Sequence, residues 1–227
     1  MFQRIFRKTK ADSSLEQLPP SALKSCLAAR PCTFHDDWAS YSYLALDFET
    51  TGLNAKRDQL LSMGYVVLKE GRILLGTGRH TVIKGDEQVG QSATLHHITD
   101  DSRSLGLTLD TALEQLFTQL HGAVLITHYS HLELSFLKQL VRTRYGSEFS
   151  YPVIDTLKLQ QRILRNYPSE NKEGSLRLDQ ARAFHHLPRY RAHNALTDAQ
   201  ACAELFLAQM THLAPNGIQL SHLLART

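Results

Sequence analysis

The clearest hydrophobic pattern in the chain is an apolar run that contains and then ends in two carboxylates. Residues 43–53 read YLALDFETTGL, and such a run is typical of a buried β-strand. Because strand side chains alternate between faces, Asp47 and Glu49 are predicted to point the same way. Two like charges in such a place repel each other unless a cation lies between them. A pair of this kind also occurs where a strand simply ends at the solvent, so the downstream residues decide between the two interpretations.

The next apolar segments predict an antiparallel meander. Leu60 to Leu68 is largely apolar, and the dipeptide Glu70-Gly71 can turn the chain. The segments Ile73 to Leu75 and His80 to Ile83 are predicted to supply the returning strand. Together with the first run, they give a three-stranded antiparallel meander.

Further along the chain, short apolar strands alternate with helices. Thr108 is predicted to cap a helix whose apolar positions recur every three or four residues, and Gly122 is predicted to end it. Ala123 to Thr127 and Tyr151 to Ile154 have the pattern of short buried strands, each followed by a helix. The predicted helices cover residues 109–120, 132–141, 155–163, 176–184 and 195–210. A meander followed by strand–helix units predicts a mixed-sheet α/β fold.

The two ends of the chain have the pattern of appendages to a single domain. The 227 residues suffice for one domain of ordinary size but not for two. Residues 1–40 contain one short helical run, at 21–29, which is too small to bury a core alone. We therefore expect an N-terminal extension at 1–40, the main domain at 41–212 and a C-terminal tail at 213–227. The tail is expected to be a frayed amphipathic end.

Composition and charge narrow the class of protein only slightly. The net charge of +3 is too mild to indicate nucleic-acid binding by itself, and it does not oppose it. The three cysteines form no CxxC motif, so the sequence predicts neither a disulfide framework nor a cysteine zinc site. No run approaches the roughly eighteen apolar residues of a membrane span. The start, MFQRIFRKTK, lacks the apolar core of a signal peptide. A soluble, cytoplasmic protein without a membrane partner is the expectation.

Two more acidic residues are predicted to reach the same edge of the sheet as the first pair. Glu133 lies in the first turn of the helix that follows the fourth predicted strand, and Asp198 lies near the start of the last long helix, five residues after His193. The ends of strands and the starts of the helices that follow them meet at one edge of an α/β sheet, where ligands usually bind. Carboxylates gathered there would repel one another strongly without a metal ion.

Three motifs resemble those of a known family. DFETTGL at 47–53, HYSHLELSFL at 128–137 and HNALTDAQA at 193–201 resemble the exonuclease motifs of the DnaQ-like, or DEDDh, 3′-to-5′ exonucleases. That family includes the proofreading subunit of bacterial DNA polymerase III and RNase T. The resemblance covers residues 43–210. It implies an RNase H-like mixed sheet, in which the antiparallel meander and parallel strands are flanked by helices.

The resemblance also implies roles for the acidic residues. In the family, the residues that match Asp47, Glu49 and Asp198 hold the metal ion that activates water, and Asp47 bridges to a second ion. Glu133 would serve that second ion, where the family usually has an aspartate. Mg²⁺ or Mn²⁺ is the expected metal, because both ions suit hard oxygen ligands. Histidine titrates near neutral pH, and the resemblance makes His193 the general base.

The segment after the acidic pair is expected to bind substrate. By resemblance, it forms the site of the 3′-terminal nucleotide and consists of Thr50, Thr51, Gly52 and Leu53. The alternative is an ordinary turn. LHHIT at 95–99 resembles the family's HGIT segment, which places His96 in the nucleotide pocket. The basic residues that approach the third motif, and that are therefore candidates for phosphate contacts, are Arg182, Arg189 and Arg191.

Three functions remain open at the level of the sequence. The first is a metal-dependent exonuclease that releases nucleoside monophosphates from single-stranded or frayed 3′ ends of DNA. The same activity on short RNA is the second, because recognition of a 2′-hydroxyl depends on pocket geometry. A catalytically dead nucleic-acid-binding module is the third. The expected partners are nucleic acid with a single-stranded 3′ end and, by resemblance, a DNA polymerase or a replication-repair protein. The sequence leaves the oligomeric state open.

Overall fold

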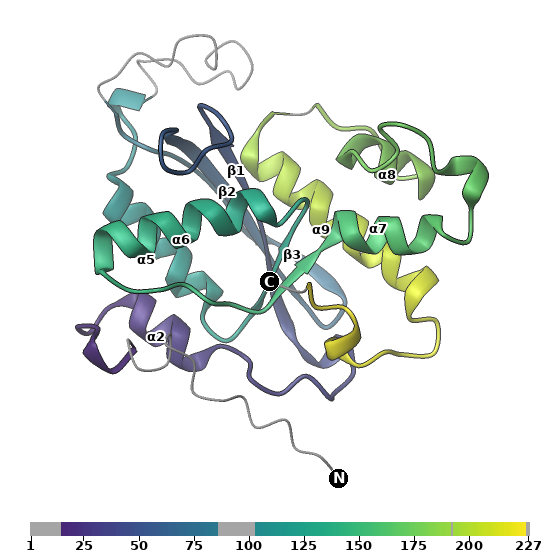
Figure 1. Ribbon diagram of the computed structural model, residues 1–227, viewed down its shortest axis with the longest axis horizontal. Coiled ribbons are helices and arrows are strands. Elements are labelled where there is room, and N and C mark those ends of the chain that lie inside the picture. The colour runs from purple at the N-terminus through teal and green to yellow at the C-terminus, as the bar shows by residue number, and fades with distance from the viewer. Residues whose placement is uncertain (1–14, 86–102, 192, 226–227) are drawn as a thin grey trace.

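A five-stranded mixed sheet runs through the centre of the molecule (Figure 1). The structure is a computed structural model that describes residues 15–85, 103–191 and 193–225. The strands lie in the order β3-β2-β1-β4-β5. Their bounds are β1 (Ser42–Thr50), β2 (Leu60–Lys69), β3 (Arg72–Val82), β4 (Val124–Thr127) and β5 (Val153–Asp155). β1, β2 and β3 form an antiparallel meander, whereas β1, β4 and β5 are parallel. The predicted mixed-sheet α/β class is therefore confirmed.

The third strand differs from its prediction. Two short pieces, at 73–75 and 80–83, were expected to form the returning ribbon, but β3 is one strand from Arg72 to Val82. Its pairing with β2 passes over this middle part through a register shift between Tyr65 and Val67. Residues 75–78 fall within this shift and have no partner in the register, whereas Arg79 pairs with Tyr65, so the strand continues through a bulge-like irregularity.

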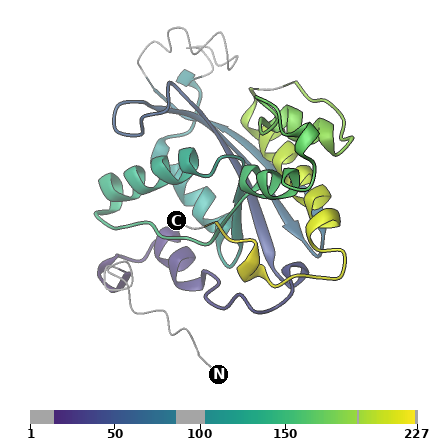
Figure 2. The ribbon, with the colours of Figure 1, turned by 45° about the vertical axis from the view of Figure 1, so that its right-hand side comes forward.

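Helices cover both faces of the sheet (Figures 1 and 2). They are α2 (Ala22–Ala29), α5 (Leu109–Leu120), α6 (His131–Tyr145), α7 (Thr156–Leu164), α8 (Leu178–Phe184) and α9 (Ala195–Leu213). Leu44 and Leu46 of β1 join the apolar cluster of α2, α5 and α6. The alternate residues Tyr43 and Ala45 join the cluster of α7 and α9 on the other face. The two-residue period of β1 thus supplies both layers of the core.

Helix α5 begins and ends as the sequence predicts. The hydroxyl of Thr108 accepts a hydrogen bond from the backbone amide of Thr111, at 3.3 Å, and so caps α5. Gly122 follows the helix with a φ of 72°, a conformation that favours glycine. Within the described ranges, no helix combines the length and the apolar character that a bilayer span needs.

The segment just before β1 pairs with the C-terminal segment of the described chain. The amide of Trp38 donates to the carbonyl of Ile218 at 2.9 Å, and the Trp38 ring packs edge-on against Phe206 of α9. Leu220 and Leu223 are buried in the cluster of α7 and α9. The expectation of a frayed tail is wrong, because these leucines complete the core. The division of the chain at residues 40 and 212 stays a prediction.

Candidate active site

Three carboxylates meet at the end of β1. Asp47, Glu49 and Asp198 each place one oxygen within 4.8 Å of the oxygens of the other two. Asp47 and Glu49 leave β1 on the same face, and Asp198 comes from the first turn of α9. Asp47 and Asp198 are half-buried, while Glu49 is buried. The structure thus brings together three of the predicted metal-binding residues, which we call the carboxylate cluster.

A glycine in the neighbouring strand allows α9 to reach the cluster. Gly64 of β2 pairs directly with Asp47. A Cβ atom on Gly64 would lie 2.0 Å from the carbonyl carbon of Ala195 and 2.1 Å from the nitrogen of Leu196. The backbone at the start of α9 therefore packs against a position that only glycine can occupy. This close approach sets Asp198 beside β1.

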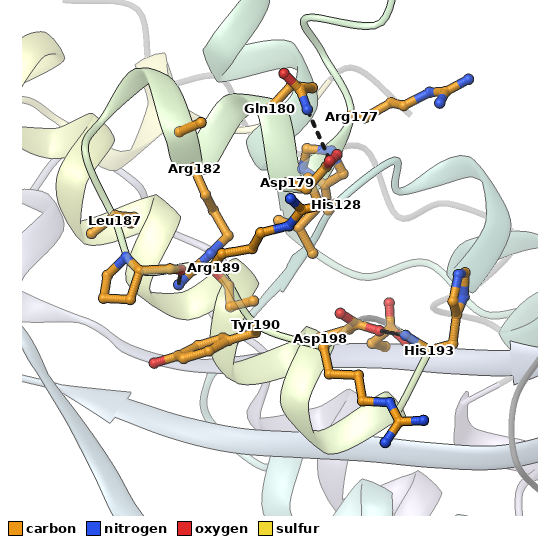
Figure 3. Close-up of a pocket in the computed structure, with 16 residues that line it drawn as sticks. His128, Arg177, Asp179, Gln180, Arg182, Leu187, Arg189, Tyr190, His193 and Asp198 are labelled. Atoms are coloured by element: carbon orange, nitrogen blue, oxygen red, sulfur yellow. Dashed lines mark hydrogen bonds between the residues drawn. The ribbon is translucent and has the colours of Figure 1, made fainter.

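Local hydrogen bonds hold the start of α9. The side chain of Asn194 accepts from the amide of Thr197 at 3.1 Å and caps the helix. The carboxylate of Asp198 accepts from the backbone amide of His193 at 2.8 Å. His193 has a φ of 69°, in the left-handed region, and its side chain is exposed. Figure 3 shows Asp198 and His193 side by side at the pocket, joined through this backbone contact.

Glu133 lies behind the cluster in the first turn of α6. Its side chain is only 1% exposed, and within the described part of the chain no hydrogen bond reaches its Oε2 atom. Burial, with a contribution from the charge of Asp155, raises the pKa of Glu133 to about 8. The charge of Glu133 in turn raises the pKa of Asp47. Glu133 therefore interacts with the cluster electrostatically, although it does not belong to the three residues that lie within 4.8 Å of one another.

Asp155 holds the start of α6 in place, a role that the sequence did not reveal. Its carboxylate accepts from the amides of Tyr129 (3.1 Å), Ser130 (3.0 Å) and Leu157 (3.0 Å), and from the Ser130 hydroxyl at 2.9 Å. It thereby caps α7 and also fixes the turn before α6, where Tyr129 has a φ of 73°. An aspartate directly before a predicted helix indicates a cap, but its second set of partners, 25 and 26 residues away, leaves no local signal.

Burial raises the pKa of each carboxylate in the cluster, and mutual repulsion adds to this for Asp47 and Glu49. Burial and the charges of Glu133, Asp198 and Glu49 raise the pKa of Asp47 well above its ordinary value. Burial and the charge of Asp198 raise the pKa of Glu49 to about 8, and burial also raises that of Asp198. Hard oxygen donors that repel one another in this way fit a divalent cation, which would offset their charge.

The predicted nucleotide-binding segment is the end of β1 and the bend that follows it, at the start of the connection to β2. The hydroxyl of Thr50 donates to the carbonyl of Gly52 at 2.7 Å, and that of Thr51 accepts from the amide of Gln59 at 2.9 Å. Leu53 is 78% exposed, which leaves its apolar surface available for contact with a sugar or a base. His96, the other predicted substrate-binding residue, lies outside the described residues.

A pocket of about 820 Å³ opens from the cluster toward α8 (Figure 3). Asp47, His193 and Asp198 line one end of it. Arg182 also borders the pocket, but it is only 3% exposed and its guanidinium is bonded within the protein. The interpretation of Arg182 as a phosphate contact is wrong, because its donors are taken up by two carbonyl groups and a carboxylate. Arg189 and Arg191 are exposed in the lining.

Comparison with known proteins identifies relatives of this protein. The model of a family described as an exonuclease, RNase_T, matches residues 44–206. The DNA polymerase III subunit epsilon of Treponema pallidum is 27% identical over 183 residues, which cover 80% of this chain and 82% of that protein. The PolC-type DNA polymerase III of Thermotoga petrophila is 26% identical over 190 residues. These residues cover 83% of this chain but only 13% of that polymerase.

Solved structures show the same fold at lower identity. The nuclease domain of 3′hExo, described as a DEDDh family member bound to rAMP, has a TM-score of 0.65 at 14% identity. The match covers 85% of this chain and 100% of that domain. The RNase H-like mixed sheet that the sequence motifs imply is therefore confirmed.

Proposed function

The chain belongs to the exonuclease family whose model covers residues 44–206, and from this premise we propose that it is a metal-dependent 3′-to-5′ exonuclease acting on DNA. The observation that carries the proposal is the carboxylate cluster at the end of β1, with Glu133 behind it. The substrate would be a single-stranded or frayed 3′ end, and the product a nucleoside monophosphate. The names of two relatives, both DNA polymerase III proteins, favour DNA and a polymerase as the partner.

The donor set suits two divalent cations. Asp47, Glu49 and Asp198 would hold one ion, and Asp47 with Glu133 the other. Mg²⁺ or Mn²⁺ bound there would supply Lewis-acid stabilisation of the charge that develops on the phosphate and its leaving oxygen. The buried Oε2 of Glu133, which no hydrogen bond from the described residues reaches, supports a ligand role for this side chain.

The remaining roles belong to groups of the chain itself. His193 would take the proton of the water that attacks phosphorus as the bond to the 3′ oxygen breaks. Its exposed position at the end of the pocket gives it access to such a water. The turn from Thr50 to Leu53 would hold the terminal sugar and base, with Leu53 against the base.

A degradation assay with matched oligonucleotides tests the proposal. The purified chain is expected to release mononucleotides from a 5′-labelled single-stranded DNA with Mg²⁺ or Mn²⁺, and to lose this activity in excess EDTA. Asp47→Ala should be inactive, since it removes a residue that would hold both proposed ions. Asp110→Ala is the matched control, because Asp110 lies on the surface of α5 in an ion pair with Arg144.

The same assay separates the alternatives. Activity that survives EDTA, or an Asp47→Ala variant as fast as wild type, would contradict the metal-dependent mechanism. Faster degradation of the matched RNA would replace DNA by RNA as the substrate. Glu133→Ala is expected to lose activity and Glu133→Asp to keep part of it, whereas wild-type rates for Glu133→Ala with both ions would exclude Glu133 as a ligand.

A further inference from the structure

The pocket that opens from the carboxylate cluster has a basic wall. Arg177, Arg189 and Arg191 are among the residues that line it, and all three side chains are exposed. Figure 3 shows Arg177 and Arg189 at the pocket, on the side of α8. We call these residues the arginine wall. The pocket volume of about 820 Å³ lies within the range of about 300–1,000 Å³ that is usual for ligand sites. We propose that the arginine wall binds the phosphodiester backbone of the substrate on the 5′ side of the bond that is cut. This inference rests on the proposed exonuclease function.

The segment that carries two of these arginines is held by an ion pair between the buried Arg182 and the half-buried Glu204. Arg182 of α8 contacts Glu204 of α9 at 2.8 Å, and its guanidinium also donates to the carbonyls of Ala201 at 2.7 Å and Pro188 at 2.8 Å. The contact with Pro188 ties the start of the segment 188–191 to both helices. A buried guanidinium bonded in this way is a rigid support, because loss of Glu204 would leave its charge unpaired and loss of a carbonyl would leave a buried donor unsatisfied.

Tyr190 anchors the segment between Arg189 and Arg191. Its hydroxyl donates to Glu204 at 2.8 Å, and its ring lies 4.5 Å from the guanidinium carbon of Arg182. Tyr190 is thus turned inward, onto this ion pair. Arg189 and Arg191 flank it in the chain and are exposed along the pocket. The fold therefore presents two cationic side chains, one on each side of Tyr190, from a supported backbone.

The position of the arginine wall suits contact with the polynucleotide backbone rather than with the terminal nucleotide. The proposed site of the terminal nucleotide, Thr50 to Leu53, lies at the end of β1 and the start of the connection to β2. The pocket is lined mainly by α8, residues 187–191, His193 and α9. The two regions adjoin the cluster from different elements. A polynucleotide whose last residue occupies the turn must leave the cluster by another path, and the pocket provides one.

The charge of the lining favours an anionic polymer. Among the residues of the lining outside the cluster, Asp179 is the acidic one, and it accepts a hydrogen bond from Gln180 at 2.9 Å. His128 does not add to the wall, because its ring atoms contact Thr156 at 2.8 Å and the carbonyl of Leu176 at 2.9 Å. Exposed arginines at such a groove suit phosphate, which they bind without reading the base.

Substrates that differ only in length test this assignment. The double variant Arg189→Gln/Arg191→Gln is compared with wild type on single-stranded DNA and on thymidine 5′-p-nitrophenyl phosphate, an ester that contains only the phosphate to be cut. We expect the variant to lose about tenfold in kcat/KM on the DNA, mainly through KM. The rate on the ester should stay within about twofold of wild type. The salt dependence of the DNA reaction should become shallower by about 0.7 per arginine, as expected for lost phosphate contacts on a single strand.

Arg144→Gln is the matched control, because Arg144 is exposed on α6 in an ion pair with Asp110. An equal loss of kcat/KM on both substrates would show that the arginines position the active site instead. Unchanged kinetics on the DNA would show that the arginines do not contact the DNA backbone. Either result would overturn the inference. Fluorescence anisotropy with labelled single-stranded DNA in EDTA measures binding independently of catalysis. If wild type cut neither substrate, the proposed function would be wrong. Weaker DNA binding by the double variant than by wild type would in that case still support phosphate binding by the arginine wall.

Discussion

At the scale of single residues, the carboxylates that could bind a metal ion are expected to lower the stability of the metal-free protein. Buried acids in close contact favour their protonated forms, whereas the same acids in the unfolded chain ionise near pH 4. Burial is the largest cause of the raised pKa of Asp47, Glu49 and Glu133, and neighbouring charges add to it. A cation in the cluster would remove much of this penalty. Stability and metal binding are therefore expected to be linked.

The linkage predicts a pH-dependent stability. Because the folded pKa is raised above the unfolded one, the folded state binds more protons, and its stability falls as the pH rises toward and through about 8, the pKa of Glu49. In EDTA, Asp47→Asn should unfold at a higher temperature than wild type, and this difference should widen as the pH rises above the ordinary pKa of an aspartate, about 4, because the pKa of Asp47 is raised in the folded state. Mn²⁺ should raise the Tm of wild type more than that of the variant.

Thermal unfolding followed by circular dichroism measures both effects. Asp110→Asn serves as the control, since Asp110 is an exposed surface residue. A Tm difference between wild type and Asp47→Asn that did not change with pH would contradict the linkage.

At the scale of elements, the site depends on how closely α9 packs against β2. Gly64 pairs with Asp47 and lies under the backbone of Ala195 and Leu196. This contact belongs to no motif of the site, yet it sets the distance between β1 and Asp198. The geometry of the cluster is thus a property of the packing of one helix on the sheet.

Replacing this glycine is predicted to impair activity more than folding. In Gly64→Ala the new methyl group would lie 2.0 Å from backbone atoms, so the start of α9 must move away from the sheet. We expect a loss of stability of about 1–3 kcal/mol, which is typical of overpacking. A loss of activity of about tenfold or more should accompany it, measured well below the Tm, since small displacements of reacting groups are costly.

Gly76→Ala is the control for this substitution, because a Cβ atom on Gly76 meets no atom within 4 Å. Both variants lie in the meander, and only the first is expected to change the rate. A Gly64→Ala enzyme with wild-type kinetics would show that α9 can adjust without moving Asp198.

At the scale of the whole molecule, the segment before β1 and the C-terminal segment close one layer of the core. The amide of Leu220 donates to the carbonyl of Asp36 at 3.1 Å, and that of Ala225 donates to Val153 of β5 at 2.8 Å. Leu220 is fully buried with α7 and α9. The segment before β1 and the C-terminal segment are therefore parts of the folded domain.

This arrangement predicts a stability defect without a catalytic one. Leu220→Ala should lower the free energy of unfolding by about 2–5 kcal/mol, because it leaves a cavity in the core. At temperatures where the variant stays folded, kcat/KM should remain near that of wild type. Leu75→Ala, at a position 64% exposed on β3, should change stability by less than about 0.5 kcal/mol. Denaturant unfolding and the exonuclease assay measure the two properties, and an unchanged stability for Leu220→Ala would contradict the structural role of the tail.

The sequence by itself determined the elements and three members of the cluster. The alternation along β1 placed Asp47 and Glu49 on one face, and the motif spacing placed Asp198 in the first turn of a helix that follows His193. The sequence also predicted that Thr108 caps α5. These features depend on neighbours within a few residues, so periodicity and spacing are enough to reveal them.

Only the tertiary structure decided which polar residues face the pocket and which support it. Arg182 and Arg189 look alike in the sequence, yet one is buried in an ion pair and the other is exposed along the pocket. Likewise, the depth of Glu133 follows from the start of α6, which Asp155 fixes from β5, and the burial of Leu220 follows from pairing with residue 36. Each of these outcomes depends on contacts between segments far apart in the chain. Such contacts leave no period in a single sequence, because the free energy of burying a side chain is set by whatever the fold brings beside it.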